Sequence, residues 1–218
     1  ATPEEARAAG LRACKLCRPD DFYLGQHAGE ALVEGLVAGM ALDPGAYRNL
    51  SALTAAADVG ASKLHELFRT HYHTTPAEML ARLRVAAARR MLLHGQRPVA
   101  EIAFEVGFES LSAFNENFRK YTAMTPAKYR RLPDEAAFEL TLPDDYPLAR
   151  ILAYLGRDRN SLTERVEGQT CLIAYRAGEQ PALVRITFDD GVARCAVALP
   201  EAPGPELMEA LHRRVLAT

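Results

Sequence analysis

Residues 109–126 read E-S-L-S-A-F-N-E-N-F-R-K-Y-T-A-M-T-P, and an earlier stretch, residues 67–76, reads L-F-R-T-H-Y-H-T-T-P. Both contain Phe-Arg, and in both a Thr-Pro pair begins six positions after the arginine, so that Thr75 matches Thr125. Two segments with one spacing predict one local structure that the chain uses twice. The predicted fold of the middle of the chain follows from this repeat.

The second copy has the pattern of a helix–turn–helix. Residues 99–106 predict a short helix, and Gly107 tolerates the positive φ that a tight turn requires. Ser110 is placed to cap the next helix by accepting a backbone N–H. The apolar residues of that helix recur at three- and four-residue spacing, which predicts one core-facing side: Leu111, Phe114 and Phe118.

The first copy has the same layout with two differences in its turn. Residues 50–57 predict its first helix and residues 61–71 its second. Asp58 stands where glycine would be expected, and Gly60 stands where Ser110 caps the other copy. In the second copy Thr125-Pro126 is expected to end the element. Between the copies, residues 77–94 predict a long helix, rich in alanine and arginine, that would hold the two units apart.

The distribution of charge favours an anionic partner. The 218 residues have a formal net charge of −2, but residues 48–131 carry thirteen Lys/Arg and seven Asp/Glu, a balance of +6. A basic centre between acidic flanks indicates nucleic acid. No run of eighteen apolar residues and no secretory signal is present in the given sequence, so a cytoplasmic location without a membrane span is expected.

Two helix–turn–helix units in a basic segment favour double-stranded DNA over the alternative, a purely structural helical bundle. Major grooves on one face of DNA recur about every 34 Å, so a monomer with two such units is expected to bind as a repressor dimer does. The side chains expected to position phosphates are the following: Arg69, Arg119, Lys120, Arg130 and Arg131.

From Gly107-Phe108-Glu109-Ser110 to Thr125-Pro126-Ala127-Lys128-Tyr129-Arg130 the sequence resembles the signature of the AraC-type transcription regulators. The resemblance covers about residues 26–132. It implies a seven-helix domain with two recognition helices, with DNA and RNA polymerase as partners. The residues implied to face bases are Ser62, His65 and Glu66 in the first helix and Leu111, Ser112, Asn115 and Glu116 in the second. The two glutamates depart from a basic recognition helix, and either accept from cytosine amino groups or lower the affinity.

The N-terminal flank, residues 1–24, contains Cys14-Lys15-Leu16-Cys17-Arg18-Pro19-Asp20 and resembles the second half of the Ada metal-binding domain. In that family four cysteinates hold zinc, and one of them accepts methyl groups from DNA phosphotriesters. The resemblance therefore implies that Cys14 and Cys17 are zinc ligands. Two thiolates do not complete a tetrahedral zinc site, so zinc is expected only with the upstream half of the domain, which would also hold the methyl-accepting cysteine.

The C-terminal flank changes period after Pro133. Alternating runs at residues 138–142, 171–175, 182–188 and 192–199 predict strands, an Asp-Gly pair at 190–191 predicts a hairpin, and residues 146–155 and 205–216 have helical spacing. Cys171 and Cys195 are expected to be small core residues. This α+β region resembles the small domain that precedes the catalytic helix–hairpin–helix domain of AlkA-type DNA glycosylases, chiefly over residues 162–168, the following strands and the last helix.

The expected fold is therefore multidomain, with a mainly α centre and an α+β C-terminal domain. Its parts are half of an Ada-like zinc domain (1–24), an AraC-type double helix–turn–helix domain (25–132) and an AlkA-like antiparallel-sheet domain (133–218). The expected function is a sequence-specific regulator of a bacterial alkylation-damage response within a larger repair fusion. No catalytic residue is predicted in this chain.

Two alternatives stay open. In the first, the parent protein is a DNA-3-methyladenine glycosylase whose catalytic domain follows residue 218, and the helical domain delivers it to DNA. In the second, weaker one, the C-terminal domain senses a small molecule. It is weaker because residues 137–218 show no convergent set of polar residues for a ligand.

Overall fold

The computed structural model describes residues 2–12, 28–177, 180–199 and 204–217. Two compact units make up the chain, Ala1–Leu83 and Arg84–Thr218. Each unit has its own cluster of buried apolar residues. The division into domains after residues 24 and 132 stays a prediction.

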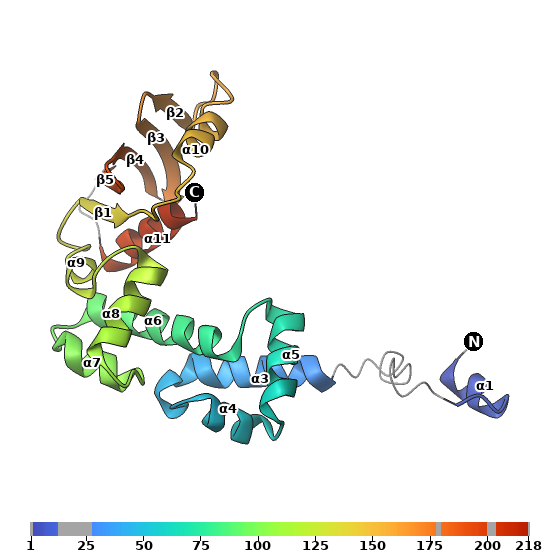
Figure 1. Cartoon of the computed structure of the whole chain (residues 1–218). Coiled ribbons are helices and arrows are strands. Elements are labelled where there is room, and N and C mark those ends of the chain that lie inside the picture. Colours follow the sequence, from blue (N-terminus) through green and yellow to red (C-terminus); the bar gives the residue numbers. More distant parts are fainter. Residues whose placement is uncertain (1, 13–27, 178–179, 200–203, 218) are drawn as a thin grey trace. The chain divides into compact units, whose positions relative to one another are not determined.

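The centre of the chain is helical, as predicted (Figure 1). Between Ala28 and Arg130, all of which the structure describes, seven α-helices follow one another: α3 (Ala28–Leu42), α4 (Leu50–Ala57), α5 (Ala61–Tyr72), α6 (Pro76–His94), α7 (Val99–Glu105), α8 (Leu111–Thr122) and α9 (Pro126–Arg130). A short 3-10 helix, η1 (Pro44–Ala46), follows α3. Helix α1 (Pro3–Ala8), which was not predicted, begins at a capping box formed by Thr2 and Glu5.

The first unit is built around α3, α4 and α5. These three helices contribute the most deeply buried side chains, each with 0% exposure: Val33, Met40, Leu53, Leu64 and Phe68. The buried side chains of these helices pack among one another and form the core of the first unit.

Both Thr-Pro pairs begin helices, and the prediction that Thr125-Pro126 ends an element was wrong. Helices α5 and α8 already end at Tyr72 and Thr122, each followed by a residue in the left-handed conformation. The Thr75 hydroxyl accepts the N–H three residues further on at 3.2 Å, and Thr125 does the same at 3.4 Å. Proline then occupies the first helical position, where its missing N–H would have had no partner in any case.

The C-terminal region contains a five-stranded antiparallel sheet in the order β1-β5-β4-β3-β2. Its elements are β1 (Ala137–Thr141), α10 (Leu148–Leu155), β2 (Glu164–Glu167), β3 (Thr170–Ala177), β4 (Gln180–Asp189), β5 (Val192–Ala198) and α11 (Pro205–Leu216). Asp190 and Gly191 both have positive φ, of 41° and 72°, which confirms the predicted Asp-Gly hairpin between β4 and β5.

One face of this sheet is buried. Phe138, Cys195, Ile186 and Cys171 lie side by side across four strands, and all four are buried. The predicted core position of both cysteines is thus confirmed. Burial raises the pKa of Cys195 to about 12, so its side chain is a neutral thiol that packs as an apolar group.

A polar seam connects the second helix–turn–helix to α11. The Nε2 atom of His212 lies 2.8 Å from the Thr122 carbonyl at the end of α8. The Arg89 Nε donates to the Tyr129 hydroxyl at 2.8 Å, and Arg89 also pairs with Glu209 at 3.1 Å. The ring of Tyr129 meets that of His212 edge to face, with centroids 5.1 Å apart. The helical and α+β parts of the second unit therefore share one core.

Electrostatics fix the protonation of the seam. Burial lowers the pKa of His212 to about 4, so the imidazole is neutral. A carbonyl oxygen only accepts, so the proton of the neutral ring lies on Nε2 and is donated to Thr122. The other ring nitrogen, Nδ1, is buried and has no partner in the part of the chain that the structure describes. Burial also raises the pKa of Tyr129 to about 12, which keeps the phenol neutral beside Arg89.

Candidate nucleic-acid interface

The two helix–turn–helix units differ in the residue that takes a positive φ at the turn and in the cap of the helix that follows. In the first, Asp58 takes the left-handed conformation with φ of 50°, which aspartate tolerates better than most residues. In the second, Gly107 has φ of 98°. The Ser110 hydroxyl accepts the N–H of Ala113 at 3.2 Å, which confirms the predicted cap, whereas Gly60 begins α5 without a side-chain cap.

The buried faces of α5 and α8 match the predicted spacing except at one residue. Leu64, Leu67 and Phe68 are buried on α5, and Phe114 and Phe118 on α8. The prediction that Leu111 faces the core was wrong, since this residue is 39% exposed. It is the first residue of α8.

The opposite faces carry the predicted DNA-contacting residues. Ser62, Glu66 and Arg69 are exposed on α5, and His65 is half-buried. On α8 the exposed polar residues are Ser112, Asn115, Glu116, Arg119 and Lys120. Side chains three and four positions apart on a helix lie one above the other. Each helix therefore presents one continuous polar stripe, and contact of these stripes with DNA stays a prediction.

Several charges on and near these stripes have partners that the sequence did not indicate. Glu66 pairs with Lys63 at 3.1 Å, so the acid on α5 is neutralised by a lysine that had not been singled out. Arg130, expected to position a phosphate, donates to the Arg97 carbonyl, and Arg131 lies 3.5 Å from Glu135. On α8, by contrast, neither Arg119 nor Lys120 forms an ion pair with a described residue. Lys120 lies over the Tyr121 ring at 5.3 Å.

The predicted metal ligands Cys14 and Cys17 lie outside the residues that the structure describes. Two thiolates fall short of the four ligands of a structural zinc site. Among the described residues, no group of three or more His, Cys, Asp or Glu is placed to hold a metal ion. Zinc binding therefore stays a prediction, and no chemistry is assigned to it.

The comparisons with known proteins centre on the helix–turn–helix pair. Residues 53–132 match a family model described as "Helix-turn-helix domain". A putative AraC-like transcription regulator of Streptomyces antibioticus is 35% identical over 91 residues, which cover 42% of this chain and 30% of that protein. Residues 53–132 form an AraC-type helix–turn–helix domain.

Further similar proteins match about a third to a half of this chain. The raffinose operon transcriptional regulatory protein RafR of Pediococcus pentosaceus is 34% identical over 70 residues, which cover 32% of this chain and 25% of that protein. The solved DNA-binding domain of AdpA, in complex with a target DNA, is 29% identical with a TM-score of 0.42, covering 45% of this chain and 88% of that one.

The match has clear limits along the chain. It spans about a quarter to a third of the length of the curated relatives. The family match ends at residue 132, so the five-stranded sheet of the C-terminal region lies outside the matched residues. Among helices of the described residues, none is both long and apolar enough to cross a membrane.

Proposed function

We propose that this chain is a sequence-specific, DNA-binding transcription regulator. The observation that carries the proposal is the pair of helix–turn–helix units in one AraC-type domain, each with a second helix buried on one face and polar on the other. The names of the matched relatives, which are transcription regulators, support it.

The exposed stripe of α8 has the chemistry for direct recognition of bases. Asn115 offers an amide that pairs with both N6 and N7 of adenine, and Glu116 accepts from the amino group of cytosine. Ser112 donates or accepts, and the methyl groups of Leu111 suit the methyl group of thymine. Arg119, which is exposed and has no acidic partner among the described residues, is the candidate for a phosphate contact.

The stripe of α5 is expected to be the weaker base reader. Its acid, Glu66, is held by Lys63, so recognition of cytosine there requires that ion pair to open. Ser62 and the half-buried His65 are the remaining base-facing candidates, with Arg69 at the phosphate. The second helix is therefore assigned the larger share of sequence discrimination.

Selection from a pool of random duplexes, followed by fluorescence anisotropy, tests the proposal. The selected duplex is expected to bind at least about tenfold more tightly than a scrambled one, and Asn115→Ala to remove most of that difference, a loss of about 1–3 kcal/mol. Arg119→Ala is expected to weaken both duplexes alike and to lower the salt slope by about one. Arg159→Ala, an exposed arginine in the turn after α10, is the matched control. Equal binding to both duplexes at every salt concentration would refute sequence-specific regulation.

The narrower role, an alkylation-damage response within a repair fusion, is a further proposal. Its support is the order of the three resembling segments, with Cys14 and Cys17 as two ligands of a zinc site completed upstream. A monomer that meets RNA polymerase on DNA belongs to the same proposal. Zinc analysis of a chain extended upstream, and transcription after treatment with a methylating agent, test it. No described residue favours the glycosylase alternative.

A further inference from the structure

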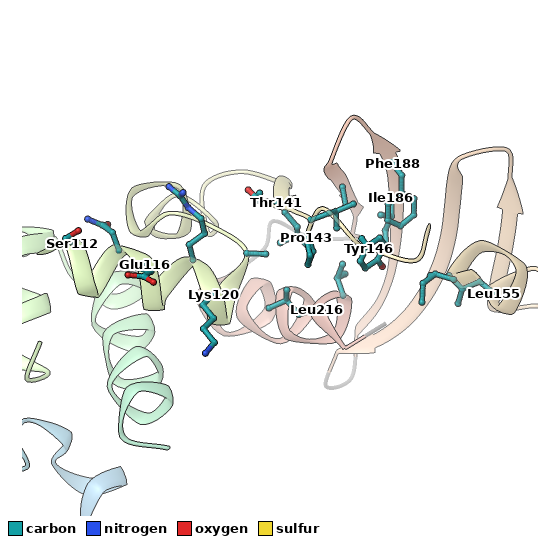
Figure 2. Close-up of a pocket in the computed structure, with 18 residues that line it drawn as sticks. Ser112, Glu116, Lys120, Thr141, Pro143, Tyr146, Leu155, Ile186, Phe188 and Leu216 are labelled. Carbon is teal, nitrogen blue, oxygen red and sulfur yellow. The ribbon is translucent and has the colours of Figure 1, made fainter. Parts of the chain in front are cut away.

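A cavity of about 850 Å³ lies in the second unit, between α8 and the α+β region (Figure 2). Its inner wall is apolar and is formed by residues of the sheet, α10 and α11: Leu140, Leu155, Ile186, Phe188, Ala193 and Val215. Sites for small molecules usually have volumes of about 300–1,000 Å³ and mostly apolar walls. The cavity has the size and lining of such a site.

The other end of the cavity is polar and belongs to α8. Figure 2 shows Ser112, Glu116 and Lys120 along this helix, at the end of the lining away from Tyr146, Ile186 and Phe188, with the Lys120 side chain pointing away from these three residues. Arg119 and Lys120 are two cations without ion-pair partners among the described residues, and Glu116 is the single acid in the lining. The lining therefore has an apolar end and an end with a surplus of positive charge.

This division of the lining selects the chemistry of the occupant. A wholly apolar molecule would make no use of the two cations, and a small hydrophilic anion would leave the partly exposed apolar residues of the lining, Leu142, Tyr146 and Leu216, in contact with water. We propose that the cavity binds a small amphipathic carboxylate, with its apolar body against these apolar residues and its head group at the α8 end, near Arg119.

An occupied cavity has a consequence for DNA. The side chains of Ser112, Asn115, Glu116 and Arg119 line the cavity and also form the stripe assigned to DNA. A carboxylate beside Arg119 would neutralise the charge intended for a phosphate and bring a negative group close to the DNA backbone. Ligand and DNA are therefore expected to oppose each other, and by linkage each lowers the affinity of the other by the same factor. This second step rests on the proposed function.

Binding is tested first, without DNA. The chain has no tryptophan, so the fluorescence of anilinonaphthalene sulfonate, itself an amphipathic anion, serves as the reporter. Dodecanoate is expected to displace it at a concentration about tenfold lower than dodecanol or dodecyltrimethylammonium, the scale of one charge–charge contact near a protein surface. Equal displacement by all three, or no bound reporter, would overturn the proposal.

Charges of opposite sign, introduced at the rim of the cavity, locate the site. Leu216 lines the cavity and is 39% exposed, so a charged side chain there is compatible with the fold. Leu216→Glu is expected to weaken dodecanoate binding about tenfold and Leu216→Lys to strengthen it. Leu162→Glu, at a residue that is 99% exposed and outside the lining, is the matched control and is expected to change nothing. Unchanged affinity in both Leu216 variants, with native circular dichroism, would overturn the assignment.

The link to DNA is tested by repeating the anisotropy titration with dodecanoate present. The selected duplex is expected to bind more weakly when dodecanoate is present, and this effect of dodecanoate is expected to be lost in Leu216→Glu. A chain that binds the selected duplex with unchanged affinity in saturating dodecanoate refutes the coupling and leaves the proposed function standing. A chain that binds dodecanoate but distinguishes no duplex from another refutes the proposed function and leaves the cavity site standing.

Discussion

His212 makes the stability of the second unit depend on pH. Its ring is buried, neutral and donates to Thr122, so protonation requires a positive charge inside the core or loss of the seam. The pKa is about 4 in the folded chain against an ordinary value of 6.5. The unfolded chain therefore binds more protons below pH 6.5. The stabilising contribution is complete above that pH and is lost as the pH falls toward 4.

The size of the effect follows from these two values. Between pH 7 and pH 5 the free energy of unfolding is expected to fall by about 2 kcal/mol on account of His212 alone. This window lies above the ordinary pKa range of carboxylates. Glu105 and Glu139, whose pKa values are lowered by Arg97 and Lys128, contribute to pH dependence only at lower pH.

Native-state hydrogen exchange on peptides from α8 and α11 measures this free energy for the second unit by itself. His212→Gln keeps an N–H donor for the Thr122 carbonyl but does not titrate. Between pH 7 and pH 5 the free energy of unfolding of this variant is therefore expected to fall by about 2 kcal/mol less than that of the wild type. His71→Gln, at an exposed residue of the first unit, should behave as wild type. If wild type and His212→Gln lose the same free energy, the ring is not buried and neutral, and the reasoning fails.

Four further stability changes are expected, each checked by urea unfolding. Ser110→Ala removes the cap of α8 and should cost about 1 kcal/mol, whereas Gly60→Ser, where an added Cβ meets nothing within 4 Å, should gain a few tenths by supplying the missing cap. Asp58→Gly relieves a left-handed residue and should stabilise the first unit by up to about 1 kcal/mol, and a loss would argue against that conformation. Arg89→Met leaves Glu209, which is only 19% exposed, without its cation and should cost about 3 kcal/mol. A cost near zero would mean that the ion pair is solvated.

Much of the fold could be predicted because local signals agreed with the final packing. Helix α4 occupies the predicted residues 50–57, and the Asp-Gly hairpin lies where the alternating pattern placed it. Strand β2 was missed because its four residues, Glu-Arg-Val-Glu, include a single apolar side chain. The role of Thr125-Pro126 was misread because proline can both stop a preceding helix and begin a following one.

Some candidate sites follow from local sequence patterns and others depend on residues far apart in the sequence. The stripes on α5 and α8 follow from helical periodicity, which the sequence displays directly. The cavity and the seam do not, because they depend on pairs such as Thr122 and His212 that lie 90 residues apart. The polar end of the cavity comes from α8, so a search for ligand-binding residues within residues 137–218 could not find it.

The end of the family match is a poor place to divide this chain. The Ala123 carbonyl, at the end of α8, accepts the N–H of Thr141 at 2.9 Å. The preceding carbonyl, that of Thr122, accepts from His212 on α11. An expression fragment that stopped at residue 132 would expose the ring of Tyr129 and leave two carbonyls at the end of α8 without these donors. A fragment meant to preserve the second recognition helix should therefore retain the sheet and α11.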